Sequence, residues 1–459
     1  MLAEGSGQRT PSRLRERQGL PGLVSGVVLL LLGLPTLAQP VPTFPGLLTM
    51  QAQTHSTYRT GFQRWRAGEA QGFQDWSTQG IRLNAQGQLV LDPEGLRQEV
   101  SLEEPEVALR TPSRLRDNAP HRLRERGRPF YPLGPYWVGE ATSPAVPTSF
   151  PMVGAIASWN ATTPPGTWLE LWIRAKLSDR WTKWYHGGVW AADPLTLASH
   201  SVQGQGDEDG NLYTDLLVLK DTLNGAEAFQ VRVRLFTQEP GRSAVVDQVA
   251  VAISNEPVRP SRLSPGDPSR WGKILDLPWC SQMVYPDGGE VWCSPTSLAM
   301  VMAYWKRDPR PCEVLVRAAV AGVYDRVYQG HGNWAFNVAH AAEQGLSGVV
   351  ARLESLAQAE AWIAAGVPVI LSYAWGEGEL EGAPIPRSNG HLAVLVGFAR
   401  GSGAEQFSHG DPIVHDPAAK TNEEVRRTYR REQLESLWLE HSGGTVYLIH
   451  PREWPVPTL

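Results

Sequence analysis

Four polar residues in the C-terminal half of the chain have types and an order that suit attack on a carbonyl group. They are Gln282, Cys293, His391 and Asp416. A cysteine nucleophile needs a base that exchanges its proton, and the base needs a third group that fixes its tautomer. A hydrogen-bond donor must also face the oxygen on which negative charge develops. The chain supplies one residue for each of these roles, and we interpret the four as one catalytic set.

Cys293 stands where a helix is expected to begin. Pro295 suits a first helical turn because its missing N–H would be unpaired there. Leu298, Met302 and Trp305 then recur at three- and four-residue spacing, which predicts a helix with a buried face. The unpaired N–H groups and the dipole at this helix end favour the thiolate. Taken alone, such a cysteine could be a small buried hydrophobic residue, so its partners decide the interpretation.

The three partner residues also fall near the ends of expected elements. Gln282 lies 11 positions before Cys293, where its amide could join the Cys293 N–H in an oxyanion hole. His391 heads an apolar run, and Asp416 follows one and precedes a proline. Taken singly, these would be a surface glutamine, a structural histidine and an Asp-Pro turn. Four such coincidences together are less probable than a catalytic set.

Alternating helices and buried strands are expected around these residues. The pattern predicts a helix over residues 333–342, with Asn333 as its N-cap. Continuous apolar runs over 366–373 and 390–398 predict strands that are buried on both faces.

The region before this part is rich in short alternating segments separated by glycine, asparagine and proline. This pattern predicts an antiparallel, all-β sandwich of jelly-roll-like type. The segments lie at 80–84, 87–91, 168–174, 229–236 and 244–252.

Other features of the β-rich region could suggest function. The aromatic cluster formed by Trp181, Trp184, Tyr185 and Trp190 could bind sugars, although packing within strands is the better interpretation. Residues 207–211 resemble a calcium loop but lack its later ligands, so we expect a hairpin turn there. The region contains no cysteine, and neither of its histidines at 186 and 200 lies near a nucleophile. We therefore expect no catalytic group from it.

The N-terminus has the three parts of a secretory signal: arginines, an apolar run and a small-residue cleavage site. A retained membrane anchor is the alternative. Composition then divides the chain, and an arginine-rich run at 107–128 is expected to be a solvated insertion. The expected parts are a signal peptide at 1–38, a linker at 39–57, the β-module at 58–255, a second linker at 256–272 and a catalytic domain at 273–455. We expect few contacts across the second linker, so that the catalytic domain would fold alone.

Composition narrows the function further. The chain has 459 residues, 42% of them hydrophobic, and a net charge of −5, which indicates a globular protein with no reason to bind nucleic acid. Of its three cysteines, Cys280 and Cys312 could pair in an oxidising compartment and leave Cys293 free. Two reduced, buried thiols are the open alternative. No cofactor or metal is expected.

The C-terminal part resembles a papain-like cysteine peptidase family, family thirty-nine, which includes the bacteriocin-processing peptidases for double-glycine leaders. It is closer to the stand-alone, exported branch of that family than to the transporter-fused branch. The resemblance covers about residues 270–452, and the matching stretches are 281–282, 292–297, 390–394, 415–417, 427–433 with Trp438, and 443–447. Ser294 departs from the pattern, because many members have glycine there.

The resemblance implies a papain-like α+β peptidase domain. It implies Cys293 as nucleophile, His391 as base, Asp416 as the residue that orients the base, and Gln282 as oxyanion donor. We expect a secreted or cell-envelope cysteine peptidase that acts on a peptide or protein substrate and has no membrane span once the signal is removed. The alternatives are a cell-wall peptide amidase or acyl transferase, and a catalytically inactive binding protein. The β-module could tether the enzyme near its substrate or pack against the site itself.

Overall fold

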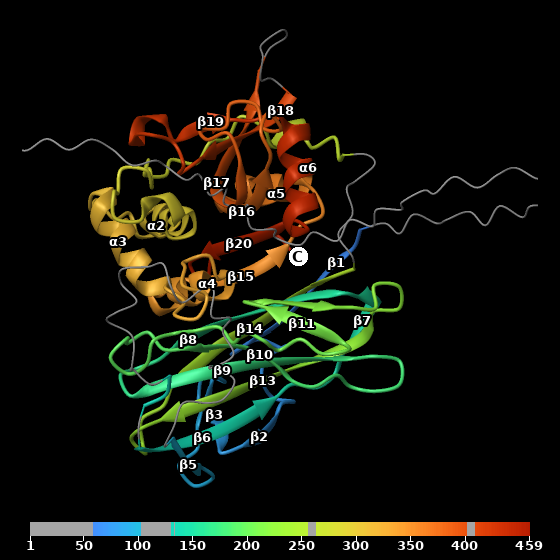
Figure 1. The fold of residues 1–459 in the computed structure, drawn as a ribbon, viewed down its shortest axis with the longest axis vertical. Helices are drawn as coiled ribbons and strands as arrows, with labels where there is room; N and C mark the ends of the chain where they lie inside the picture. The colour runs from blue at the N-terminus through green and yellow to red at the C-terminus, as the bar shows by residue number, and fades with distance from the viewer. Residues whose placement is uncertain (1–57, 102–129, 133, 256–262, 402–408) are drawn as a thin grey trace, which may run out of the picture. The chain divides into compact units, whose positions relative to one another are not determined.

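The computed structural model describes residues 58–101, 130–132, 134–255, 263–401 and 409–459 (Figure 1). The expected signal peptide at 1–38, the linker at 39–57 and the arginine-rich run at 107–128 lie outside these residues. So does the start of the second linker, at 256–262. Within the described ranges, none of the helices is both long and apolar enough to cross a membrane.

In the N-terminal part, the residues that the structure describes form two antiparallel sheets of seven strands each. One has the order β11-β12-β8-β14-β4-β3 with β1 on β14, and the other β10-β9-β13-β6-β2 with β5 on β6 and β7 on β13. The strands are β1 (Thr60–Arg66), β2 (Ser77–Gln79), β3 (Ile81–Leu83), β4 (Leu89–Leu91), β5 (Arg97–Ser101), β6 (Gly134–Thr142), β7 (Val146–Met152), β8 (Gly154–Thr162), β9 (Thr167–Lys176), β10 (Tyr185–Trp190), β11 (Gly210–Tyr213), β12 (Leu216–Leu219), β13 (Ala226–Thr237) and β14 (Val245–Ser254).

Apolar and polar side chains alternate along β9 and β13, so that one face of each strand is apolar and contributes to a shared core. Leu171 of β9 lies opposite Val233 of β13, and both are buried. They belong to the same apolar cluster as Trp159 and Val251 of the other sheet. The two sheets therefore bury one common interior, as strands with a period of two require. Jelly-roll connectivity stays a prediction.

The C-terminal part has the expected α+β composition. Its described residues form an antiparallel sheet of six strands in the order β15-β20-β16-β17-β18-β19. The elements are α2 (Cys293–Lys306), α3 (Cys312–Val323), α4 (Trp334–Glu343), β15 (Ser347–Arg352), α5 (Leu356–Ala364), β16 (Val369–Trp375), β17 (Ser388–Arg400), β18 (His409–His415), β19 (Arg426–Thr428), α6 (Arg431–Ser442) and β20 (Thr445–His450), with short 3₁₀ turns η3 (Pro268–Arg270), η4 (Gly289–Val291) and η5 (Asn422–Glu424).

The predicted helices and strands lie close to their expected places. Asn333 caps α4 by accepting a hydrogen bond from the Phe336 N–H. One difference concerns His391, which was expected at the head of a strand. β17 already begins at Ser388, because Ser388 pairs with Trp375 of β16.

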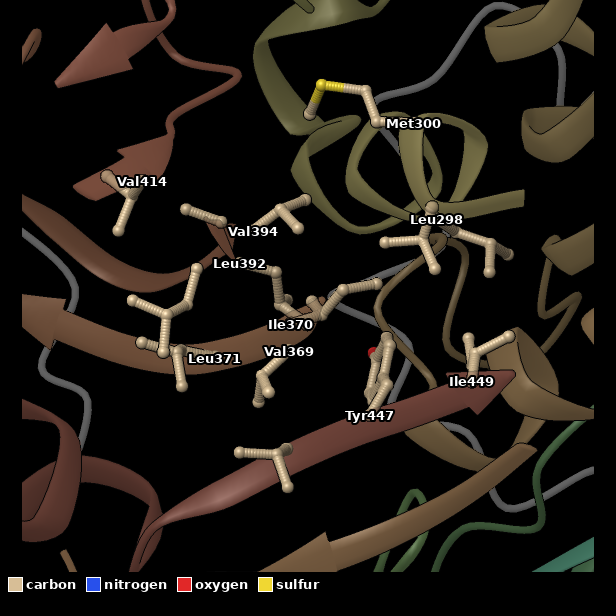
Figure 2. Close-up of a cluster of buried hydrophobic side chains, with 14 of the residues drawn as sticks. Leu298, Met300, Val369, Ile370, Leu371, Leu392, Val394, Val414, Tyr447 and Ile449 are labelled. Carbon is tan, nitrogen blue, oxygen red and sulfur yellow. The ribbon is translucent and has the colours of Figure 1, made fainter. Parts of the chain in front are cut away.

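Helix α2 packs against the six-stranded sheet (Figure 2). A buried cluster joins them, and it includes Leu298, Met300, Val369, Ile370, Leu371, Leu392, Val394, Val414, Tyr447 and Ile449. The Ser297 hydroxyl also donates a 3.0 Å hydrogen bond to the Leu392 carbonyl oxygen. These contacts fix α2, which begins at Cys293, relative to β17, which carries His391.

The expectation of few contacts across the second linker is wrong. Ala335, Phe336 and Ala339 of α4 belong to the apolar cluster of the β-module. The Phe336 ring lies 5.3 Å from that of Trp190, centroid to centroid. In addition, Asn160 of β8 donates a 2.7 Å hydrogen bond to the Gly348 carbonyl oxygen of β15. The two parts share buried apolar surface, which the composition of the linker does not reveal.

The sequence features of the β-module have structural roles. Tyr185 and Trp190 are buried, so packing is confirmed for these two aromatic residues. Asp207 accepts hydrogen bonds from the N–H groups of Asp209 and Gly210, both at 3.1 Å, in the turn that leads into β11. Residues 207–211 thus form a turn, but not the expected hairpin, because β11 begins at Gly210 and pairs with β12, which follows it.

Candidate active site

Cys293 is the first residue of α2, and its thiol is partly exposed and free. No side chain caps this helix end, so the first N–H groups remain available to an anion. The other two cysteines, Cys280 and Cys312, form a disulfide with a Cα–Cα distance of 5.5 Å. The structure thereby decides the pairing that the sequence left open.

His391 and Asp416 come together because β17 and β18 are neighbouring strands. His415 lies opposite Val394 in this pairing, and Asp416 follows directly after β18. The His391 Nε2 atom lies 2.8 Å from Asp416 Oδ1. Burial lowers the pKa of His391, but the Asp416 carboxylate and hydrogen bonds to Asp416 and Cys293 outweigh it and raise this pKa to about 10. The imidazolium form is favoured.

Two tyrosines that the sequence did not single out hold the Asp416 carboxylate. Tyr429 and Tyr373 donate hydrogen bonds to Oδ2 at 2.7 and 3.2 Å, and the Ala418 N–H donates to Oδ1 at 2.9 Å. Burial raises the pKa of Asp416, yet the charge of His391 and these hydrogen bonds lower it overall. Asp416 is therefore a fixed, ionised partner for the imidazole.

Aromatic rings confine the imidazole as well. Trp375 and Tyr373 of β16 meet His391 edge to face, with centroid distances of 5.3 and 5.5 Å. His391 itself is only 2% exposed. Rings packed around a base limit its rotation, so the ring nitrogens keep their directions towards Asp416 and Cys293.

Gln282 lies in the loop before η4 and is buried. Its Nε2 donates a 2.8 Å hydrogen bond to the Gly289 carbonyl oxygen, and an amide nitrogen has a second N–H to donate. Its backbone N–H donates a 2.8 Å hydrogen bond to the Pro417 carbonyl oxygen, one residue beyond Asp416. Gln282 is thus tied to the turn that leads into Cys293 and to the segment after Asp416.

Ser294, the residue that departs from the family pattern, does not line the surface. Its side chain is buried, and its hydroxyl lies 3.0 Å from the Tyr447 hydroxyl of β20. The Ser294 hydroxyl therefore connects the start of α2 to β20 of the six-stranded sheet.

An open cavity of about 1010 Å³ lies between the β16–β17 loop and α6. Trp375, whose ring packs against His391, belongs to its lining together with Glu379, Arg387 and Glu432. None of the four candidate residues lines this cavity.

Two family models match the chain. Residues 55–254 match the Peptidase C39 N-terminal domain, and residues 274–446 match the Peptidase C39 like family. A search of curated proteins finds no match. The second match contains all four residues selected from the sequence, and the first covers the β-module.

Proposed function

Because this chain belongs to the peptidase C39 family, we propose that it hydrolyses peptide bonds with Cys293 as the nucleophile, His391 as acid and base, and Asp416 as the orienting residue. The main support for this proposal is the buried hydrogen bond of 2.8 Å between His391 and Asp416, together with the free thiol of Cys293 at the start of α2. A thiolate beside an imidazolium is the reactive pair of cysteine hydrolases.

The proposed reaction has two steps. The Cys293 thiolate attacks the carbonyl carbon, so that a C–S bond forms and an electron pair moves to the oxygen. His391 gives its proton to the departing nitrogen, the C–N bond breaks, and a thioester remains. Water then loses a proton to His391 and attacks the thioester, which releases the acid and restores the thiolate.

The oxyanion of the intermediate needs fixed donors. We assign the backbone N–H of Cys293 and the side-chain amide of Gln282 to this role. The hydrogen bond from Gln282 to the Gly289 carbonyl oxygen supports it, since it fixes the amide plane and leaves one N–H to donate. Removing one such donor typically slows turnover by about 10²–10³-fold.

Peptide-library digestion by the wild-type and Cys293→Ala proteins tests the proposal. We expect cleavage by the wild type, none by Cys293→Ala, and full cleavage by Ser269→Ala, an exposed control outside the site. Release of ammonia from side-chain amides, or transfer to an added amine without hydrolysis, would instead indicate an amidase or acyl transferase. No turnover at all, despite a reactive thiol, would indicate a binding protein.

We also propose that the protein works outside the cytoplasm. The Cys280–Cys312 disulfide supports this, because disulfides persist in oxidising compartments. The secretory pattern of residues 1–38 points the same way. Mass analysis of the mature protein should show a chain that begins near Gln39, whereas an intact N-terminus would indicate a retained anchor.

A further inference from the structure

A segment of the C-terminal part lies beside the nucleophile and has no role in the proposed reaction. It runs from Asp325 to Trp334, between α3 and α4. Its His331 ring lies 6.1 Å, centroid to centroid, from that of Trp292, the residue just before Cys293. Tyr328 is the large apolar residue that the segment leaves exposed, at 47%.

Tyr328 folds back towards the residues that pack against Trp292. A Cβ atom added to Gly332, the residue after His331, would lie 3.6 Å from the Tyr328 hydroxyl. The Tyr328 hydroxyl therefore lies near the part of the segment that contacts Trp292, the neighbour of Cys293. Burial raises the pKa of Tyr328, and the negative charge of Asp215 in the β-module raises it further.

The β-module binds the first end of this segment. The Arg326 N–H donates a 3.0 Å hydrogen bond to the Ser199 carbonyl oxygen. The Ser201 N–H donates a 3.0 Å hydrogen bond to the Asp325 carboxylate. Both serines are buried and lie between β10 and β11.

The β-module binds the second end as well. Asp215, at the turn between β11 and β12, accepts a hydrogen bond from the Trp334 N–H at the start of α4. Burial raises the pKa of Asp215 to about 7 despite this bond, with a further contribution from Asp325. The preceding residue, Thr214, has a φ of 57°, which non-glycine residues seldom adopt. Such a conformation persists where its surroundings enforce it.

Internal hydrogen bonds connect the two ends. Asp325 accepts hydrogen bonds from the N–H groups of Val327 and Tyr328, both at 3.0 Å. Its other carboxylate oxygen accepts a 2.9 Å hydrogen bond from the Asn333 amide. Because Asp325 is fully buried, the segment keeps one conformation only while all these donors stay in place.

We propose that the β-module forms part of the substrate site: by holding residues 325–334 at both ends it places Tyr328 beside Cys293 to contact the substrate, with Asp215 as a positioning residue. The proposal rests on the proposed peptidase function. It differs from tethering in what it predicts for short peptides. A tether would leave their reactions unchanged, whereas residues that contact the substrate in the site affect every peptide-like molecule.

The test compares two reagents that alkylate Cys293 in the full chain. Iodoacetamide is small and reports the thiol alone, whereas a tripeptidyl chloromethyl ketone must also fit beside it. In Asp215→Ala we expect the peptidyl reagent to react about tenfold more slowly, with the iodoacetamide rate within about twofold. Asp215→Asn keeps an acceptor oxygen and should restore the rate. Asp221→Ala is the matched control, because the Asp221 carboxylate accepts hydrogen bonds from Leu223 and Asn224, within its own turn of the β-module.

Tyr328→Ala supplies a second variant that removes an exposed side chain. We expect the same selective loss with the peptidyl reagent, and Tyr328→Phe should react as the wild type does. Unchanged ratios of the two rates in both Asp215→Ala and Tyr328→Ala would overturn the proposal in favour of tethering. If Asp215→Ala unfolds, as judged by circular dichroism, Tyr328→Ala alone decides. A wild type that reacts with both reagents yet cleaves no peptide refutes the peptidase function and still allows this comparison.

Discussion

His391 and Asp416 meet through a 2.8 Å hydrogen bond between Nε2 and Oδ1, and neither side chain is exposed by more than 3%. Since Nε2 is engaged, Nδ1 is the ring nitrogen available to Cys293. Two tyrosine hydroxyls hold the other carboxylate oxygen. The orientation of the His391 ring therefore depends on a carboxylate that is itself held by Tyr373 of β16 and by Tyr429, the residue after β19.

Replacing Asp416 with Asn should impair the chemistry more than substrate binding. The amide NH₂ would face groups that already donate, either the His391 N–H or the hydroxyls of Tyr373 and Tyr429. We expect kcat to fall about 100-fold, with KM within a factor of about three. Asp411→Asn is the control, because Asp411 is buried on β18, the strand that precedes Asp416, but accepts a hydrogen bond from the Arg431 N–H. Equal losses in both variants would contradict the assigned role of Asp416.

Activity should persist to high pH. In the proposed reaction, the imidazolium gives its proton to the leaving nitrogen. Burial lowers the pKa of His391, but the Asp416 carboxylate and the contact with Cys293 outweigh it and raise this pKa to about 10. We expect kcat/KM to fall as pH rises through about 10, and at lower pH in Asp416→Asn.

The same shift predicts how stability depends on pH. The folded-state pKa of His391 lies above its ordinary value of 6.5, so its contribution is fully present below pH 6.5 and is lost as pH rises through about 10. Urea denaturation measures the free energy of unfolding of the wild type and of Asp416→Asn. We expect the wild type to be the more stable at neutral pH, and the difference between the two free energies to shrink as pH rises towards about 10. An alkaline limb of kcat/KM near pH 6.5 would contradict both expectations.

Gly289 should be intolerant of a side chain. A Cβ atom there would collide with the carbonyl oxygen of Gln282 and lie 3.1 Å from the Tyr285 Cβ. Gly289→Ala should displace Gln282 and lower kcat by about 10²-fold, as loss of one oxyanion donor does. Gly206→Ala is a suitable control, since Gly206 does not have a positive φ and its added Cβ would meet no atom closer than 3.4 Å. Near-normal turnover in Gly289→Ala would exclude Gln282 from the oxyanion hole.

The disulfide should stabilise the loop that carries Gln282. Cys280 and Cys312 are 32 positions apart, so the chain-entropy argument predicts a loss of about 3–4 kcal/mol in the double Ser variant. Denaturant titration measures this loss. Under non-reducing conditions, iodoacetamide should label Cys293 alone, and labelling at three sites would show that the bond is absent in the isolated protein.

The catalytic part should not keep its stability without the β-module. A chain that begins near Pro260 would expose Phe336, which is fully buried against Trp190 and Trp159. In the full chain, Phe336→Ala should cost about 3–5 kcal/mol. Leu223→Ala, at a side chain that is 87% exposed, should change stability by less than about 0.5 kcal/mol. A truncated protein with wild-type stability and thiol reactivity would show that the shared apolar surface is dispensable.

Local patterns in the sequence predicted much of the fold. The apolar spacing after Cys293 predicted a helix that begins at the thiol, and α2 begins there. Alternation over 168–174 and 229–236 predicted strands, and β9 and β13 pair with their apolar faces aligned. These features could be predicted because the spacing of apolar side chains, and the residues at the ends of helices and strands, depend on backbone geometry within a few residues. The types and order of the four candidate residues were equally visible.

What only the tertiary structure decided depends on pairing between distant segments. Tyr373 and Tyr429 reach Asp416 because β16, β17 and β18 are adjacent in one sheet, and the chain beyond β19 returns to it. Asp215 reaches Trp334 across 119 positions. The position of α4 against the β-module arises in the same way, since an apolar helix face does not specify which surface will cover it. The hydrophobic effect is not directional, so it does not select which apolar surface covers another. The partners of these residues are therefore decided only when the whole chain is folded.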